Sequence, residues 1–442
     1  MLPAREPDSA GRVTYQNRLQ MAIQKRATNN ASEAAENGAS WRAVPCEGQA
    51  PRAPRLSARV GRIAPFRVVE ILERARELER TGRDVVHFEV GEPDFPTAPT
   101  VVAAGIEALS AGRTGYTQAL GLPALRAAIA ARYGVAANRV AVTTGASGAL
   151  NLLAQVLIDP GDEVLVPDPG YPCNDVFIQA AGGVARRVPV SASTRFLLDR
   201  AALEDAWTAR TTGVLLGSPA NPTGSVLRRA DLVAIRDFVT ERGFVIVDEI
   251  YNGLVYDVED GLSGEDLLFE SALSVGDGVF VVNSFSKYFG MTGWRLGWLV
   301  APESAMDAIE RVAQNLYIAP PSVAQYAALA ALQAPAMAVH EERRRIFARR
   351  REMLLDGLAR LGLPVAQRPT GAFYAYADIG ATGWDSEAFC ERLIEEFGVA
   401  VTPGTDFGAF RASKHVRFAY TVDEREIAKG IERIGEALRR LG

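Results

Sequence analysis

The feature that most constrains this chain of 442 residues is a series of short, nearly all-apolar runs separated by helical patterns. The runs are rich in β-branched residues and do not alternate apolar with polar positions, which is typical of strands buried on both faces. Such strands, separated by helices, predict a largely parallel sheet with helices on both sides. The predicted strands are residues 140–143, 163–166, 184–190, 213–216, 244–247, 279–282 and 296–300.

Both ends of the chain predict a second, smaller domain. An amphipathic helix at 66–78 and a strand at 85–90 come first, and after about Ala301 the chain is mainly helical, with short strands near 372–377 and 416–420. The expected fold class is therefore α/β, a large domain with a mostly parallel, doubly covered sheet plus a smaller α+β domain built from both chain ends. The predicted boundaries are 96–310 for the large domain, 56–95 and 311–442 for the smaller one, and 1–55 for an extension expected to be disordered.

Composition excludes several classes of protein. The net charge of −5 does not suit binding to nucleic acid or to an anionic membrane surface. Cys46, Cys173 and Cys390 are odd in number and unclustered, which favours a reducing, cytoplasmic location over a disulfide scaffold. The three histidines lie far apart, so no histidine-based metal site is expected. The alanine-rich run at 322–339 predicts one packed helix, because it falls short of the apolar length of a membrane span.

Lys287 stands out in the loop that follows the predicted strand 279–282. A single loop lysine is usually a solvated surface residue, but burial in this loop would lower the pKa of its ammonium group. Lys287 would then carry the free amine that Schiff-base formation requires. Ser284 and Ser286 just upstream, with Arg295 eight residues downstream, form a candidate phosphate cradle in which the arginine binds as a fork.

Three more polar residues follow neighbouring predicted strands. Asp248 and Tyr251 come after 244–247, and Asn221 comes after 213–216 in an Asn-Pro-Thr-Gly sequence. An aspartate at this place can cap a helix, and Asn-Pro-Thr-Gly makes a good turn. The functional alternative is that Asp248 pairs with a protonated pyridine nitrogen while Asn221 and Tyr251 donate hydrogen bonds to a phenolic oxygen of the same ring.

A phosphate site is also predicted where Gly145, Ala146 and Ser147 precede a helix expected at 149–158. Small residues at a helix N-terminus present free N–H groups and a partial positive charge, which suit an anion. A glycine-rich turn of this kind is common, so it is a weak signal by itself. Tyr171, which follows the next strand, can stack on a flat ring or lie half-buried in a surface turn.

Taken together and in this order, these residues resemble the class I aminotransferases of pyridoxal-phosphate fold type I, in the aspartate aminotransferase-like branch. The likeness runs from about Ile63 to the C-terminus. It implies an enzyme that moves an amino group between an L-amino acid and a 2-oxo acid by a ping-pong mechanism, through a Schiff base on Lys287. The resemblance gives catalytic roles to Lys287, Asp248 and Tyr251. Its cofactor-binding positions are Gly145, Ala146, Ser147, Tyr171, Asn221, Asp248, Tyr251, Ser284, Ser286, Lys287, Arg295 and Tyr116.

The resemblance also implies how substrates and subunits meet. Gly91, Asn221 and Arg417 match positions that bind the substrate carboxylate, and a charge inside the apolar strand of Arg417 would be costly without a partner. Tyr116 matches a tyrosine that reaches the cofactor phosphate of a neighbouring subunit, which implies a homodimer with shared active sites. No second arginine for a side-chain carboxylate is evident. An apolar or aromatic pocket is an equal alternative, near Phe66, Gln118, Tyr317, Phe373 and Phe407.

Two other functions are weighed against this one. A β-lyase acting on a sulfur amino acid would keep the cofactor and the fold, since one scaffold hosts many activities. It would differ by needing no 2-oxo acid as amino acceptor. A sensing domain of a transcription regulator would carry a helix-turn-helix domain ahead of the fold, but residues 1–55 show neither apolar helix periodicity nor a basic recognition face.

Overall fold

The computed structural model describes residues 55–256 and 271–441. The described residues from Ala58 onward belong to one compact unit. The expectation for residues 1–55 lies almost wholly outside the described residues, and the domain boundaries proposed from the sequence stay predictions.

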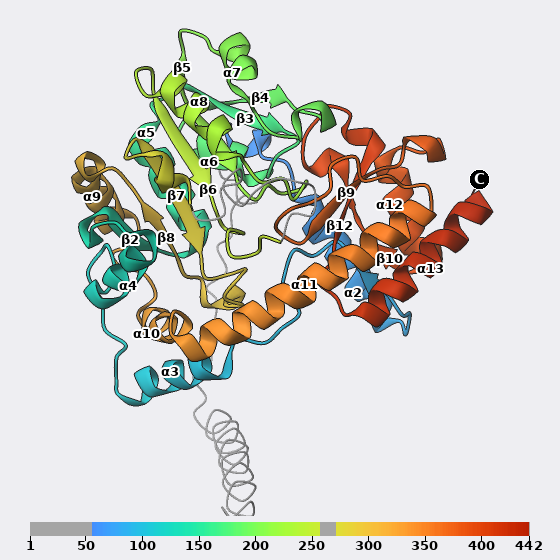
Figure 1. Ribbon diagram of the computed structural model, residues 1–442, viewed down its shortest axis with the longest axis horizontal. Helices are drawn as coiled ribbons and strands as arrows, with labels where there is room; N and C mark the ends of the chain where they lie inside the picture. The colour runs from blue at the N-terminus through green and yellow to red at the C-terminus, as the bar shows by residue number, and fades with distance from the viewer. Residues whose placement is uncertain (1–54, 257–270, 442) are drawn as a thin grey trace, which may run out of the picture. The chain divides into compact units, whose positions relative to one another are not determined.

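All seven runs predicted as buried strands form one sheet (Figure 1). The strand order is β2-β8-β7-β6-β5-β3-β4, and β8 runs antiparallel to both of its neighbours while the other pairs are parallel. The predicted α/β class with a mostly parallel sheet is therefore confirmed. The strands are β2 (Val140–Thr143), β3 (Glu163–Asp168), β4 (Val184–Pro189), β5 (Thr211–Gly217), β6 (Phe244–Asp248), β7 (Val279–Ser284) and β8 (Gly297–Val300).

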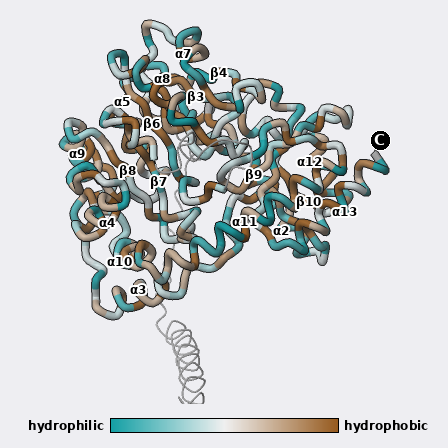
Figure 2. Tube along the Cα trace, in the orientation of Figure 1, coloured by the Kyte–Doolittle hydropathy of each residue, from teal (hydrophilic) through white to brown (hydrophobic). Residues whose placement is uncertain are grey.

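Helices cover both faces of this sheet, which explains why its strands lack a polar face, except for the edge strand β4, which carries Arg186 and Arg187. Successive residues of a strand point to opposite sides, so Val164 and Val166 pack with α5 and α9 while Leu165 belongs to the cluster that includes α4 and α8. Figure 2 shows the strands as the most hydrophobic part of the trace. The helices here are α4 (Pro123–Tyr133), α5 (Gly145–Leu157), α6 (Cys173–Ala180), α7 (Arg200–Ala206), α8 (Arg229–Val239) and α9 (Met306–Leu316).

The first and last described segments lie side by side (Figure 1). β1 (Val86–His87) pairs in parallel with β10 (Val399–Ala400), so the strand predicted at 85–90 is shorter than expected because its partner offers only two residues. β11 (Thr402–Pro403), β12 (His415–Ala419) and β9 (Tyr374–Asp378) form an antiparallel sheet in that order. The helices around these strands are α2 (Arg67–Arg80), α12 (Ser386–Phe397) and α13 (Glu424–Leu441).

The prediction of one helix over 322–339 is wrong. The chain forms α10 (Ser322–Ala331), which packs on α3 (Pro99–Ser110), and then α11 (Ala334–Arg360), with a bend of 77° between α10 and α11. Pro335 lies in the first turn of α11, where its missing N–H costs no helical hydrogen bond. Among the described residues, no single helix is long and apolar enough to cross a membrane, and α10 with α11 meets the length and composition only across this bend.

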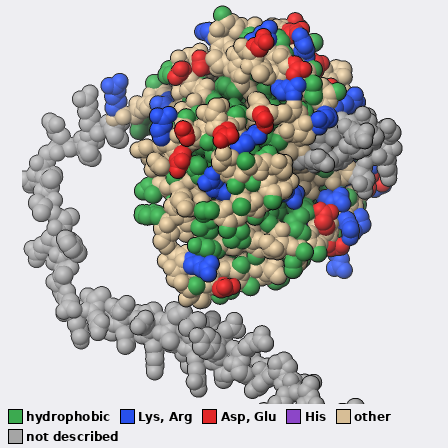
Figure 3. Space-filling model, turned by 60° about the vertical axis from the view of Figure 1, so that its left-hand side comes forward, with side chains coloured by type: hydrophobic (Ala, Val, Ile, Leu, Met, Phe, Trp, Pro, Cys, Tyr) green, Lys and Arg blue, Asp and Glu red, His purple; other side chains and the backbone are tan. Residues whose placement is uncertain are grey.

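Acidic and basic side chains are interspersed on the face of the molecule shown in Figure 3. Among the described residues, several ion pairs lie along a single helix, such as Arg67 with Glu70 at 2.7 Å, in which both side chains are about half exposed. Exposed pairs of this kind contribute little to stability. The buried apolar side chains of the two sheet faces therefore hold the fold together.

Candidate active site

A cavity of about 270 Å³ opens beyond the carboxyl ends of the parallel strands, where ligands bind in sheets of this type. Loops after β2, β3, β5, β6 and β7 contribute to its wall, and so does β12 of the smaller sheet. The structure thus brings together residues that are far apart in the sequence. The predicted site residues that line the cavity are Gly91, Ala146, Ser147, Tyr171, Asn221, Asp248, Tyr251, Ser286, Lys287, Arg295 and Arg417.

Three predicted site residues do not line the cavity. Gly145 lies directly behind the guanidinium of Arg295. Ser284 lies behind Ser286, and its hydroxyl donates a hydrogen bond to the Ser286 hydroxyl at 2.8 Å. Tyr116 is 84% exposed and borders a separate surface hollow, so the structure of one chain does not bring it to the site.

Lys287 follows β7 and projects its amine into the cavity. Nζ donates a hydrogen bond to the backbone oxygen of Gly91 at 2.6 Å. Burial lowers the pKa of Lys287 to about 8, and the positive charges of Arg417 and Arg295 act in the same direction, against the carboxylate of Glu92. The neutral, nucleophilic fraction of the amine near neutral pH is therefore much larger than for an exposed lysine.

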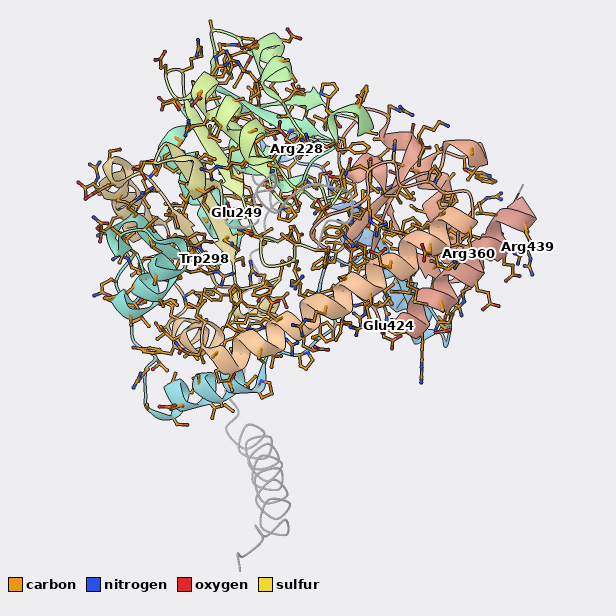
Figure 4. The ribbon with its side chains drawn as sticks, viewed as in Figure 1. Arg228, Glu249, Trp298, Arg360, Glu424 and Arg439 are labelled. Atoms are coloured by element: carbon orange, nitrogen blue, oxygen red, sulfur yellow. The ribbon has the colours of Figure 1, made fainter. Side chains whose placement is uncertain are left out.

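Asp248, the last residue of β6, is a buried acid at the floor of the same cavity. One carboxylate oxygen accepts a hydrogen bond from the backbone N–H of Ile250 at 3.1 Å, and no ion pair of Asp248 occurs among the described residues. Burial raises its pKa to about 7. Its neighbour Glu249, labelled at the end of β6 in Figure 4, instead accepts hydrogen bonds from Ser271 and Ala272. Asp248 therefore remains available to pair with a protonated nitrogen of a ligand.

Arg417 is held in place by neutral oxygen atoms. Its Nη2 donates to the backbone oxygen of Glu89 at 2.5 Å and to the hydroxyl of Thr402 at 3.3 Å, and its Nη1 donates to the side-chain oxygen of Asn221 at 3.1 Å. The guanidinium also lies 4.4 Å from the ring centre of Tyr374. These contacts fix the fork without neutralising it.

The charge of Arg417 is unusual among the buried arginines that the structure describes. Arg350 and Arg351 are also buried, and each has a carboxylate partner, in Asp94 and Glu352 respectively. Arg417 is 2% exposed, has no carboxylate within ion-pair distance in the described chain, and leaves its Nε without a partner. An unpaired buried cation is costly, so this geometry provides a place for the carboxylate of a ligand.

A second candidate anion site lies at the N-terminus of α5. Arg295 adopts a left-handed backbone conformation with φ of 54° and donates from Nη1 to the backbone oxygen of Thr292 at 3.0 Å. A Cβ added to Gly145 would lie 2.7 Å from Nη2 of Arg295, so the glycine permits the close approach. Free N–H groups of the first helical turn, the Ser147 side chain and the guanidinium together suit a phosphate.

The sequence as a whole decides the family. Residues 83–434 match the model of the family described as aminotransferase class I and II. The chain belongs to this family. Class I and II aminotransferases are pyridoxal-phosphate enzymes, and this chain is an aminotransferase.

Several named proteins are similar to this aminotransferase over nearly their whole length. A valine–pyruvate aminotransferase of Mycobacterium tuberculosis is 37% identical over 391 residues, covering 87% of this chain and 98% of the relative. An aspartate/prephenate aminotransferase of Thermus thermophilus is 37% identical, with 87% and 99% covered. The solved structure of an aspartate aminotransferase from Thermus thermophilus with maleate superimposes with a TM-score of 0.80 at 36% identity, covering 87% of this chain and 99% of that one.

Some lining residues of this aminotransferase were not found by sequence reasoning. Of the positions expected to form an apolar pocket, Phe66 lines the cavity, whereas Gln118 borders the outer hollow beside Tyr116. Tyr374 also lines the cavity, but in the sequence it looks like an ordinary aromatic residue of a buried strand. Other lining residues that carried no distinct signal are Asn174, Phe196, Leu197, Leu198, Leu227 and Thr292.

Proposed function

We propose that this aminotransferase binds pyridoxal phosphate covalently through Lys287 and transfers an amino group between an L-amino acid and a 2-oxo acid. The observation that carries the proposal is the environment of the Lys287 amine. Lys287, with its pKa lowered to about 8, shares a cavity with the buried acid Asp248 and with the two arginines Arg295 and Arg417, for which the described residues offer no carboxylate. The cofactor or the substrate offers a group of opposite charge or reactivity to each of these residues: an aldehyde for Lys287, a pyridine nitrogen for Asp248, and a phosphate and a carboxylate for the two arginines.

The residues present fit the phosphate group of this cofactor. Arg295 would bind it as a fork, with the first turn of α5 at Gly145, Ala146 and Ser147 donating backbone N–H groups. Ser286 would add its hydroxyl, and Ser284 would orient Ser286 from behind. Gly145 leaves the space that Arg295 occupies, which a larger residue would fill.

The residues present also fit the ring. Asp248 would hold the proton on the pyridine nitrogen, and the positive charge of that nitrogen would in turn restore an ordinary pKa to the buried acid. Asn221 and Tyr251, both in the cavity wall, would donate hydrogen bonds to the phenolic oxygen. Tyr171 would stack on one face of the ring.

Pyridoxal phosphate supplies, when bound, an aldehyde carbon that condenses with amines and a ring that accepts the electron pair left when the Cα proton departs. Arg417 orients the carboxylate of the amino acid, beside Gly91 and Asn221, so that Cα faces Lys287. Nζ of Lys287 is neutral above about pH 8 because burial lowers its pKa, and it can accept the Cα proton and later return it. Asp248 keeps the pyridine nitrogen protonated during this transfer.

A ping-pong order follows from the number of carboxylate sites. With Arg295 at the phosphate end, Arg417 is the one fork left for a carboxylate among the described residues that line the cavity. The amino acid and the 2-oxo acid that replaces it therefore use the same fork in turn. The relatives that are named as aminotransferases favour this reaction over β-elimination from a sulfur amino acid.

The side chain of the preferred amino acid is proposed to be uncharged. The charged residues among the described cavity lining are Asp248, Lys287, Arg295 and Arg417, and each already has a role in the proposal. This chain thus offers no further cation to a side-chain carboxylate, although relatives are named for aspartate. The apolar lining residues include Phe66, Val68, Phe196, Leu197, Leu198, Leu227 and Ile250.

A homodimer with shared active sites is proposed as the working form. Arg295 and Ser147, at the phosphate end of the cavity, are exposed in the single chain. Tyr116 is exposed as well, at a loop that is free to contact a neighbour. A second chain that covers the phosphate end with Tyr116 would account for both observations.

Borohydride reduction tests the covalent attachment. The protein incubated with pyridoxal phosphate should absorb visible light, and reduction should fix the cofactor on the peptide that contains Lys287. Lys287→Ala should lose the label and the transamination activity, whereas Lys429→Ala, on α13 and ion-paired with Asp84 outside the cavity, should keep both. A label on any other lysine, or a colourless wild-type protein, would show that the assignment is wrong. Product formation that needs no 2-oxo acid would favour the lyase instead.

A further inference from the structure

Tyr374 occupies a position in the cavity wall that neither the sequence nor the family description assigns. It is the first residue of β9, is 2% exposed, and lines the cavity next to Tyr251. The hydroxyl oxygens of Tyr374 and Tyr251 are 2.9 Å apart, which is a hydrogen bond, and the two rings are nearly perpendicular. Tyr374 therefore touches one of the two groups proposed to hold the phenolic oxygen of the cofactor.

Three neighbours fix the ring of Tyr374. The guanidinium of Arg417 lies 4.4 Å from its ring centre, and the ring of Phe373 packs against it at 4.9 Å. On a third side, Gly91 presents its backbone, and a Cβ at that position would collide with the Tyr374 hydroxyl. The hydroxyl therefore has a defined place between Tyr251 and the segment that holds Lys287 through the Gly91 oxygen.

The number of hydroxyl protons determines which tyrosine donates in the hydrogen bond between Tyr374 and Tyr251. Burial raises the pKa of both tyrosines above the ordinary value, so each hydroxyl carries its single proton at neutral pH. Neither hydroxyl has another hydrogen-bond partner among the described residues. If Tyr251 gives its proton to the cofactor, its oxygen is left to accept one, and Tyr374 is the neighbour that can donate it.

We propose that Tyr374 is a positioning residue that donates its hydroxyl proton to Tyr251 and thereby turns the proton of Tyr251 toward the phenolic oxygen of the cofactor. This inference rests on the proposed function. A hydroxyl that accepts one hydrogen bond becomes a stronger donor in the next, because the two bonds polarise each other. Tyr374 also ties the ring-binding Tyr251 to the carboxylate-binding Arg417 through one side chain.

Removing only the hydroxyl of Tyr374 separates this role from packing. Tyr374→Phe keeps the ring beneath Arg417 but leaves Tyr251 without its donor. A hydrogen bond to the phenolic oxygen withdraws electron density from the cofactor–lysine linkage, so its loss should raise the pH midpoint of the visible absorbance change. The expected upward shift is about half a pH unit to one unit, with about a tenfold loss in kcat/KM, the size of one hydrogen bond.

The decisive experiment is a double-mutant cycle on purified protein loaded with pyridoxal phosphate, followed by spectrophotometric pH titration. Tyr251→Phe should give a larger upward shift, and adding Tyr374→Phe to it should change nothing further, because Tyr374 acts through Tyr251. Tyr376→Phe is the matched control. It removes an equally buried hydroxyl from the same strand, outside the cavity lining and without a hydrogen-bond partner, so its titration should equal that of wild type.

The possible failures can be told apart. A wild-type protein that shows no visible absorbance with pyridoxal phosphate contradicts the proposed function itself. A wild-type protein that absorbs and titrates, together with a Tyr374→Phe variant that titrates identically, overturns only the role of Tyr374. That role is also overturned if the shift caused by Tyr374→Phe persists at full size in the Tyr251→Phe background, or if Tyr376→Phe produces it as well.

Discussion

Replacing Arg417 by lysine is the sharpest test of the carboxylate site, because it keeps the charge and removes the fork. The arginine can present two N–H groups to a carboxylate while its other groups bind Glu89, Thr402 and Asn221. A lysine at the same place is shorter, has no planar fork and cannot satisfy all three oxygens as well as a substrate. The variant should therefore lose the equivalent of one charge-assisted hydrogen bond in the transition state.

A hydrogen bond to a charged group contributes about 1.5–3 kcal/mol, so kcat/KM for amino acids should fall roughly 10- to 150-fold. The assay compares an amino acid with the amine obtained by removing its carboxylate. Wild type should strongly prefer the amino acid, and Arg417→Lys should lose most of that preference while reacting with the amine almost as wild type does.

Arg350→Lys provides the matched control for this measurement. It shortens another buried arginine, one whose guanidinium binds both carboxylate oxygens of Asp94 at 2.8 and 2.9 Å and does not line the cavity. This variant should lose stability while keeping the preference for the amino acid. Equal losses for the amino acid and the amine in Arg417→Lys would refute the assignment of Arg417 as the carboxylate site.

Three further predictions follow from the same cavity. In the folded, cofactor-free protein Asp248 keeps its proton up to about pH 7, whereas an unfolded aspartate releases it near pH 4. The free energy of unfolding of the protein should therefore fall as the pH rises from about 4 to about 7. Asp248→Asn should remove this contribution, which is at most about 4 kcal/mol, as measured by denaturant titrations at several pH values. An unchanged pH dependence in this variant would contradict the burial of the acid. Gly145→Ala should weaken cofactor binding about tenfold in equilibrium dialysis, because φ is 76° at this position and the new Cβ would lie 2.7 Å from Nη2 of Arg295. Gly134→Ala is the control: φ is 65° there too, but the new Cβ would meet open space, so this variant should only lower the melting temperature. Across about twenty amino acids, those with uncharged side chains should show higher kcat/KM than aspartate and glutamate, and a preference for the two acids would show that a cation reaches the cavity from elsewhere.

The sheet was predictable because most of its strands are apolar on both faces, a pattern that is visible in the local sequence, whereas the edge strand β4 carries Arg186 and Arg187 and is partly exposed. Details that depend on a distant partner were not. The strand expected at 85–90 is cut to Val86–His87 by the length of β10, and nothing in the sequence of β8 shows that it runs antiparallel. The helix after β2 begins at Gly145 rather than at 149, because its small residues enter the first turn instead of preceding it.

The candidate site also has residues that a local pattern predicts and residues that only the structure identifies. Lys287, Asp248 and Asn221 were recognisable because polar residues at the ends of apolar strands are conspicuous, and the topology brings them into one cavity. Tyr374 was missed because a tyrosine in a buried strand looks like core packing, and its place in the cavity wall, 2.9 Å from the Tyr251 hydroxyl, is visible only in the structure. Tyr116 lies outside the cavity of the single chain, and its proposed role depends on a second chain.

The fork of Arg417 has a consequence for how the protein is made. Its anchor is the backbone of Glu89, which lies 328 residues earlier in the sequence. The ribosome synthesises β2 to β8, and with them Lys287, before it reaches Arg417, so the proposed carboxylate site cannot form until β12 has been made and has met Glu89. If Arg417 is the carboxylate site, a protein split between these two segments should therefore recover amino-acid recognition only when both pieces are present.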